Sequence, residues 1–177
     1  AFYFDIRKDA LYCDSKDSDR RKSCIIVLNI LLESLSKWFA PILSFTTEEI
    51  FKLINKDEKS IHLEKFMKFP KFFENDQLNK KWIELKKIRD VCNVSIETKR
   101  ASKEIGSSLE ANLVISLNKN LKELTKDIDM SELCITSAVE IIESTNNDTT
   151  VQTKKAVGEK CVVCWKIIKN GCLRHKN

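Results

Sequence analysis

Residues 78–117 read LNKKWIELKKIRDVCNVSIETKRASKEIGSSLEANLVISL, and the hydrophobic period of this segment changes midway. Its first part carries apolar residues in steps of three and four, which is the spacing of one stripe along an α-helix. The stripe consists of Leu78, Trp82, Leu85, Ile88, Cys92 and Ile96. This pattern predicts a long helix over residues 78–103, which ends before the helix breaker Gly106.

The segment after Gly106 alternates between apolar and polar residues up to Leu117, which is typical of a half-buried strand. Asn118 then stands where it can cap a short helix, and a second alternating stretch begins near Leu133. A strand, a helix and a strand within about 35 residues predict a small α/β unit over residues 105–143. The polar residues 144–156 are interpreted as a linker that has little to bury.

The first part of the chain predicts a helical bundle. Residues 17–40 carry an apolar stripe, and Pro41 ends or kinks that helix because proline lacks an N–H. The run TTEE at 46–49 reads as a capping box that opens a short helix through Leu53. A short strand is expected around residues 61–63. Together with the long helix, these elements predict a helical domain over residues 1–104.

The composition agrees with a mainly α fold. The chain has 177 residues, of which 42% are apolar and 32% charged, as in ordinary globular proteins. Only three glycines and two prolines occur, which favours long helices over a β-sandwich with many turns. No apolar run approaches the roughly 20 residues that a membrane span needs, so no membrane partner is expected. The chain opens on AFYF, as though within an element, and we interpret it as a piece of a longer protein.

The seven cysteines fall into two groups. Cys13, Cys24, Cys92 and Cys134 stand singly among apolar or helical residues, where small buried side chains are expected. The other three cluster near the C-terminus, which suits a metal site in a reducing compartment better than a disulfide framework. A cytoplasmic protein is therefore expected.

The C-terminal cysteines combine with a histidine in the spacing C-x2-C-x7-C-x2-H. The four residues are Cys161, Cys164, Cys172 and His175. Two intervening residues let both side chains of a pair turn toward one ion, and four such ligands close a tetrahedral structural zinc site. A closed site has no position for substrate, so it would support the folding of a zinc-binding module at residues 157–177. The alternatives are a redox pair, or free thiols beside a surface histidine.

Positive charge gathers at the same end of the chain. Residues 151–177 hold seven lysines and arginines against Glu159 alone, a net charge of +6; the whole chain carries +5, so the first 150 residues carry −1. A polyanion such as RNA would be drawn to this end first, although charge runs of this kind also occur as solvated tails.

No catalytic constellation stands out in the sequence. It has no Gly-rich phosphate loop, no nucleophile elbow and no H-E-x-x-H motif. The remaining histidine, His62, is expected to be a packing or surface residue.

Four stretches carry a family resemblance. They are FYFDIRKDALYC at 2–13, WFAPILSFTTEE at 38–49, IGSSLEA at 105–111 and GEKCVVCW at 158–165. The first resembles the segment that leads into the anticodon-binding domain of bacterial isoleucyl-tRNA synthetases, and the second is similar to a motif shared with related class I synthetases. The third resembles the isoleucyl branch in particular, and the fourth the start of its C-terminal zinc module.

The resemblance implies the C-terminal, tRNA-binding part of an enzyme that activates isoleucine with ATP and charges tRNA(Ile). In such enzymes the helical domain holds the anticodon stem and loop, and the zinc module adds contacts to the tRNA. Their catalytic signatures, His-Ile-Gly-His and Lys-Met-Ser-Lys-Ser, are absent here, so ATP and Mg²⁺ would bind upstream and this chain alone should be inactive. The parent is expected to be monomeric. One departure is that the family closes its zinc site with a later second Cys pair, where this chain has Cys172 and His175.

The RNA surface is expected to combine cations for phosphates with planar groups for unstacked bases. The candidates on the outer face of the long helix are Arg89, Arg100 and Lys103. Those in the zinc module are Lys160, Trp165, Lys166 and Arg174. Alternatively, Trp165 covers the metal site and the cations are merely solvated.

Two other functions remain open from the residues. One is a stand-alone zinc-dependent RNA-binding module without an enzymatic role. The other is a helical interaction protein with incidental cysteines, which would bind neither zinc nor RNA.

Overall fold

The computed structural model describes residues 2–55, 59–146 and 148–175. The described chain is mainly helical with a small sheet region, as predicted. It divides into two compact units, one spanning Asp14–Glu74 and the other combining Ala1–Cys13 with Asn75–Asn177. No helix in the described part of the chain has both the length and the apolar character to cross a membrane.

The unit Asp14–Glu74 is built from two α-helices and two short 3₁₀ helices. They are α2 (Asp19–Phe39), α3 (Ser44–Ile54), η1 (Ile61–Leu63) and η2 (Lys71–Phe73). The hydroxyl of Ser18 caps α2 by accepting from the N–H of Arg21. Helix α2 packs against α3 and η1.

The predicted start of α3 and the strand after it are wrong. Helix α3 begins at Ser44, so Thr47 lies inside it and its hydroxyl donates to the carbonyl of Leu43 at 2.9 Å. The Glu48 carboxylate accepts from the Ser60 hydroxyl at 2.8 Å and from the N–H of Ile61 at 2.9 Å. These bonds fasten the start of η1 to α3, so residues 61–63 form a 3₁₀ turn instead of a strand.

The apolar stripe of α2 is only partly covered in this unit. Among the described residues, α2 buries Cys24, Ser34 and Ser36. The stripe residues Val27, Leu32, Leu35, Trp38 and Phe39 are 38–50% exposed. Within the described part of this unit, α3 and η1 pack against α2 and cover only part of its surface, so hydrophobic spacing alone does not determine which residues are buried.

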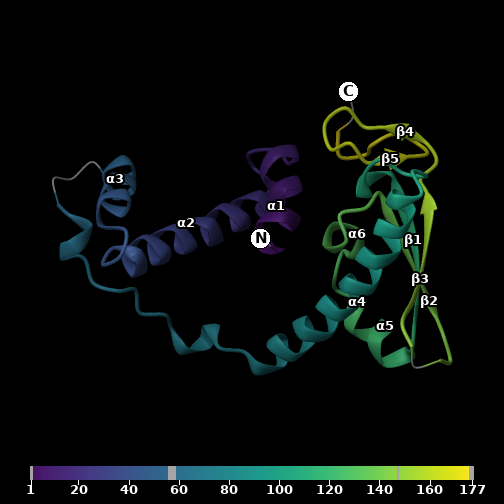
Figure 1. Ribbon diagram of the computed structural model, residues 1–177, viewed down its shortest axis with the longest axis horizontal. Coiled ribbons are helices and arrows are strands. Elements are labelled where there is room, and N and C mark those ends of the chain that lie inside the picture. The colour runs from purple at the N-terminus through teal and green to yellow at the C-terminus, as the bar shows by residue number, and fades with distance from the viewer. Residues whose placement is uncertain (1, 56–58, 147, 176–177) are drawn as a thin grey trace. The chain divides into compact units, whose positions relative to one another are not determined.

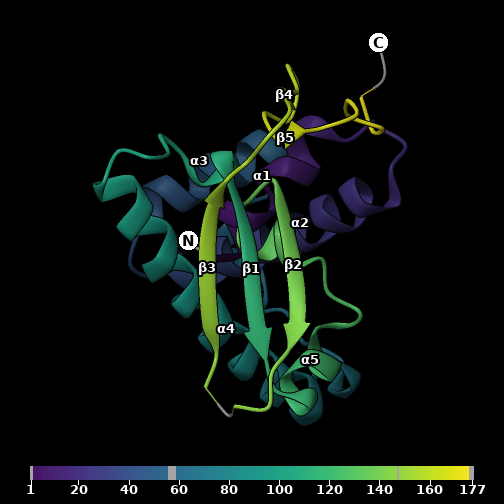
Figure 2. The same cartoon turned by 90° about the vertical axis from the view of Figure 1, so that its right-hand side faces the viewer.

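The other unit places the long helix α4 (Asp76–Ala101) against a three-stranded sheet. The strands are β1 (Ala111–Leu117), β2 (Ala138–Glu143) and β3 (Thr150–Lys155). Strand β1 lies in the middle, parallel to β2 and antiparallel to β3, as Figure 2 shows. The remaining elements are α1 (Phe2–Cys13), η3 (Ser108–Glu110), α5 (Lys119–Thr125), α6 (Met130–Leu133), β4 (Glu159–Lys160) and β5 (Ile167–Ile168).

The core of this unit lies between α4 and β1, which confirms the two patterns in residues 78–117. The buried residues of α4 are Leu85, Ile88, Cys92 and Ile96. Alternate residues of β1 are buried, namely Ala111, Leu113, Ile115 and Leu117. The predicted cap at Asn118 is confirmed, since its side chain accepts from the N–H of Leu121 at 2.9 Å. Leu78, at the start of the predicted stripe, is 49% exposed.

Two details of the α/β region differ from the prediction. The second strand starts at Ala138, because Met130–Leu133 forms α6 and Ile135 has a φ of 56°, which no strand accommodates. The predicted linker 144–156 contains β3, whose Thr153 is buried and lies 2.7 Å from the Ser95 hydroxyl of α4. An edge strand needs only one buried face, so a polar sequence can form it. The predicted domain boundaries themselves stay a prediction.

Candidate metal centre

The four predicted metal ligands lie together at the C-terminal end of the described chain, which is yellow in Figure 1. The ligand atoms of Cys161, Cys164, Cys172 and His175 all lie within 4.8 Å of one another. His175 Nδ1 is 3.4 Å from the Cys161 sulfur and 3.3 Å from the Cys172 sulfur. The sulfurs of Cys164 and Cys172 are 3.9 Å apart, far beyond the length of a disulfide bond.

These separations match a tetrahedral site around one ion. Metal–sulfur bonds of about 2.3 Å and metal–nitrogen bonds of about 2.0–2.1 Å place two sulfurs about 3.8 Å apart and a sulfur about 3.6 Å from a nitrogen. Three of the separations, at 3.3–3.9 Å, lie close to these values, and all of them lie within 4.8 Å. The cluster has the donor atoms and the spacing to bind one metal ion.

A short hairpin presents the first two ligands. Strands β4 and β5 pair antiparallel, and the turn between them contains Cys161 and Cys164. The N–H of Trp165 donates to the carbonyl of Cys161 at 2.9 Å, and the N–H of Cys161 donates to the carbonyl of Lys166 at 2.9 Å. Trp165 has a φ of 63°, an uncommon conformation for a bulky residue. The turn therefore holds both thiols on the same side of the hairpin.

The environment gives the two thiols of this turn different proton affinities. Backbone hydrogen bonding, first from Cys164, lowers the pKa of the Cys161 thiol to about 6. Burial raises the pKa of the Cys164 thiol to about 11. The thiolate form is therefore favoured more strongly at Cys161 than at Cys164.

Two contacts between the cluster and α1 were not anticipated from the sequence. Arg174 forms two hydrogen bonds with the Asp9 carboxylate of α1, at 2.7 and 2.6 Å. His175 Nε2 lies 2.7 Å from the carbonyl oxygen of Cys13, the last residue of α1. These partners are more than 160 positions apart, so no local sequence signal connects them.

The predicted burial of the scattered cysteines is confirmed for three of the four. Cys24, Cys92 and Cys134 are buried. Cys13 is only half-buried, because it ends α1 beside the metal cluster, where its thiol donates a weak 3.6 Å hydrogen bond to the carbonyl of Val163.

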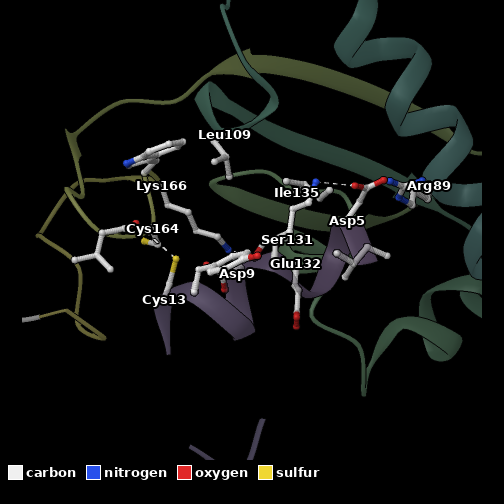
Figure 3. A pocket seen from close by; sticks show the side chains of 15 residues that line it. Asp5, Asp9, Cys13, Arg89, Leu109, Ser131, Glu132, Ile135, Cys164 and Lys166 are labelled. Carbon is white, nitrogen blue, oxygen red and sulfur yellow. Dashed lines mark hydrogen bonds and ion pairs between the residues drawn. The ribbon is translucent and has the colours of Figure 1, made fainter. Parts of the chain in front are cut away.

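A cavity of about 530 Å³ lies between α1, α6 and the metal-bearing segment. Figure 3 shows Asp9 and Cys13 on the α1 wall of the cavity, which Cys164 also lines. The Lys166 ammonium reaches across and donates to the Ser131 hydroxyl at 3.0 Å. Lys166 thus connects the metal-bearing segment to α6.

The three RNA candidates on the long helix lie in different surroundings. Arg89 is not on the outer face: its Nε donates to the carbonyl of Leu133 at 2.9 Å, and its guanidinium lies over the Phe2 ring. Arg100 is exposed and pairs with Glu97 at 2.7 Å. Lys103 is exposed just beyond the end of α4.

The candidates near the metal cluster also divide into two kinds. Trp165 is 60% exposed, and the Lys160 ammonium lies 5.6 Å from the centre of its ring. Lys166 and Arg174 instead bond to Ser131 and Asp9 within the chain. Trp165 and Lys160 therefore form the outward-facing cationic and aromatic pair of this segment.

Comparison with known proteins places the chain in a family. A model of the anticodon-binding domain of tRNA ligases matches residues 1–115. The chain belongs to this family of anticodon-binding domains. The match spans α1 to α4 and most of β1, and the metal cluster lies beyond it.

Several curated isoleucine–tRNA ligases are similar to this anticodon-binding-domain protein. The protein from Pelagibacter ubique is 68% identical over all of this chain, which covers 20% of that relative. The one from Bradyrhizobium diazoefficiens is 40% identical over 94% of this chain, and the one from Mesorhizobium japonicum is 45% identical over 77%. The chain spans about a fifth or less of the length of these relatives.

Proposed function

We propose that this chain is the anticodon-binding and metal-binding part of an isoleucine–tRNA ligase and that its partner is tRNA(Ile). The observation that carries the proposal is the 68% identity to such a ligase along the whole chain. The match to anticodon-binding domains over residues 1–115 supports the type of partner.

In this proposal the chemistry of the ligase takes place outside the chain. The ATP-dependent activation of isoleucine, with its Mg²⁺, belongs to the part of the relatives that these residues do not match. The present residues supply tRNA binding, in a cytoplasmic enzyme that acts as a monomer. They are expected to show no aminoacylation on their own.

The metal ion in the proposal is a single structural Zn²⁺. Three cysteine sulfurs and one imidazole are the donor set that zinc prefers in structural sites. Four protein ligands leave no open coordination position, so the ion would hold the hairpin and the following loop in place without activating water. Proton release from Cys164 would accompany binding.

The proposed RNA surface rests on the cations and the ring that face outward. Lys160 and Trp165 combine a charge for phosphate with an exposed indole for an unpaired base. Arg100 and Lys103 supply further charge beyond the buried part of α4. To reach RNA, three further candidates would have to release contacts within the chain: Arg89, Lys166 and Arg174. We therefore consider them weaker candidates than the four residues above.

The test measures tRNA binding and zinc content on the same samples. Trp165→Ala is expected to weaken binding by about 5- to 100-fold, the range for loss of one stacked base. Lys160→Ala is expected to weaken binding and to reduce the slope of log affinity against log salt by about one, as for one lost phosphate contact. The control is Lys126→Ala, an exposed lysine that pairs with Glu123.

The alternative, a stand-alone zinc-dependent RNA-binding module, makes a different prediction. It would bind RNA through the same residues but would not distinguish tRNA(Ile) from other tRNAs. Equal binding by the wild type and the Trp165 and Lys160 variants would contradict the proposed surface in either case.

A further inference from the structure

His175 is the metal ligand whose orientation depends on a distant part of the chain. Its Nδ1 faces the sulfurs of Cys161 and Cys172, while its Nε2 lies 2.7 Å from the carbonyl oxygen of Cys13. A carbonyl oxygen only accepts hydrogen bonds, so Nε2 must carry the proton. The Nδ1 lone pair is then directed toward the sulfurs, as a metal ligand requires.

The contact between His175 and Arg174 competes with this assignment, because the Nε–H of Arg174 approaches the same ring nitrogen. Arg174 Nε lies 3.3 Å from His175 Nε2. The bond from His175 Nε2 to the Cys13 carbonyl is shorter, so it determines the tautomer. When Nε2 carries the proton, Arg174 Nε–H cannot donate to it. The two terminal nitrogens of the Arg174 guanidinium instead donate to the Asp9 carboxylate at 2.7 and 2.6 Å.

The end of α1 is suited to receive these two residues. Cys13 is the last residue of α1, and carbonyl groups at a helix end can accept hydrogen bonds from groups outside the helix. The imidazole N–H satisfies one of these carbonyls. Asp9 lies one turn earlier, and its side chain is only 22% exposed, so its bidentate pair with Arg174 is less screened by water than an open surface pair.

We infer that α1 is part of the metal centre: Asp9 fixes Arg174, the Cys13 carbonyl fixes the adjacent His175, and together they position the fourth metal ligand. Asp9 and Arg174 are thus positioning residues, and metal binding fastens the C-terminal segment to α1. This inference rests on the metal site of the proposed function. It assigns Arg174 to the metal centre instead of the RNA surface.

The test measures Zn²⁺ affinity by competition with a chelator, on the full 177-residue chain. Asp9→Asn and Arg174→Gln are each expected to weaken affinity by about 10- to 100-fold, the range for partners that orient a metal ligand. The double variant is expected to be no weaker than either single variant, because both remove the same contact. The matched control is Asp5→Asn on the same helix, whose carboxylate pairs with Lys8 at 2.9 Å, and its affinity should stay within about twofold of wild type.

A second measurement does not depend on any substitution. In the zinc-loaded wild type, the ¹⁵N and ¹H resonances of His175 should show a metal-bound Nδ1 and a protonated Nε2. Amide hydrogen exchange in the last turn of α1 should slow when zinc binds to the wild type and to Asp5→Asn, but not when it binds to Asp9→Asn.

The outcomes separate the two proposals. A wild-type chain that binds no zinc would overturn the metal site itself. A wild-type chain that binds zinc, with Asp9→Asn and Arg174→Gln matching Asp5→Asn in affinity, would overturn the role of α1 alone. Coordination of zinc through Nε2 would also overturn it, whatever the variants show.

Discussion

Gly158 lets the two sides of the metal-bearing hairpin approach closely, because glycine has no Cβ. A Cβ at this position would lie 2.5 Å from the backbone carbonyl carbon of Ile168, and the residue has a φ of 140°. Gly171, near the third ligand Cys172, also has a positive φ of 76°, but a Cβ there would meet nothing within 4 Å. Both glycines thus have a positive φ, but only Gly158 has no room for a Cβ.

We predict that Gly158→Ala disrupts the metal-bearing hairpin and that Gly171→Ala is tolerated. Gly171→Ala adds only left-handed backbone strain of about 1–2 kcal/mol. Gly158→Ala adds strain and also a clash with backbone that a side-chain rotation cannot relieve. Chelator competition should show that Gly158→Ala weakens Zn²⁺ affinity at least about tenfold more than Gly171→Ala. Equal affinities of the two variants would show that the close approach at Gly158 is not needed.

At the scale of the elements, the sequence predicts a helix or strand correctly where the element buries one face and its hydrophobic period is regular. The α4 stripe through Leu85 and Ile88 and the alternation of β1 are both found because each element has one buried face. Strand β3 was missed because its partner, β1, lies more than 30 residues earlier. The four ligands were predicted from spacing, whereas Asp9 was not, because only the tertiary fold brings α1 beside them.

Helix α6 is a short element that depends on its cap. The Asp129 carboxylate accepts from the N–H groups of Ser131 and Glu132 at 2.9 and 3.0 Å. Burial alone would raise the pKa of Asp129, but these bonds and the Ser131 hydroxyl outweigh it and lower the pKa below its usual value. The charged form therefore stabilises the folded protein.

We predict that Asp129→Ala reduces the free energy of unfolding by about 1 kcal/mol at pH 7, as for loss of a helix cap. Asp129→Asn should reduce the free energy of unfolding by less, because the asparagine side-chain oxygen can still accept hydrogen bonds from the helix N–H groups. Since the folded pKa is lowered, the advantage of wild type over Asp129→Asn is complete above the unfolded pKa near 4 and fades as the pH falls through the folded value. Denaturant titrations at several pH values would test this, and an advantage that grows as the pH falls would contradict it.

At the scale of the whole molecule, the hydrophobic core and the metal cluster are largely separate. The core cluster spans α1, α4, β1 and α6, and none of the four candidate ligands belongs to it. The metal-bearing segment instead contacts the rest of its unit through α1, through the bond from Lys166 to Ser131 and through the bond from the N–H of Ile167 to the Ser137 hydroxyl. The ion should therefore stabilise one segment and not the entire fold.

We predict that removal of zinc with a chelator unfolds residues 159–175 locally and leaves the α4–β1 core folded. Amide hydrogen exchange should rise in β4 and β5 and stay slow in β1. Added Zn²⁺ should restore protection, whereas Mg²⁺ should not, because it prefers oxygen ligands. Loss of protection throughout β1 on chelation would show that the metal holds the whole unit together.

The proposal that this chain binds the anticodon of tRNA(Ile) can be tested directly by affinity measurements. The affinity of the zinc-loaded chain is measured for tRNA(Ile) and for the same tRNA with a changed anticodon, each across a series of salt concentrations. We expect tighter binding of the natural anticodon at every salt concentration. We also expect both affinities to fall with salt, because phosphate contacts with Lys160 and its neighbours release counterions. Equal affinity for the two tRNAs would contradict the claim that this chain binds the anticodon.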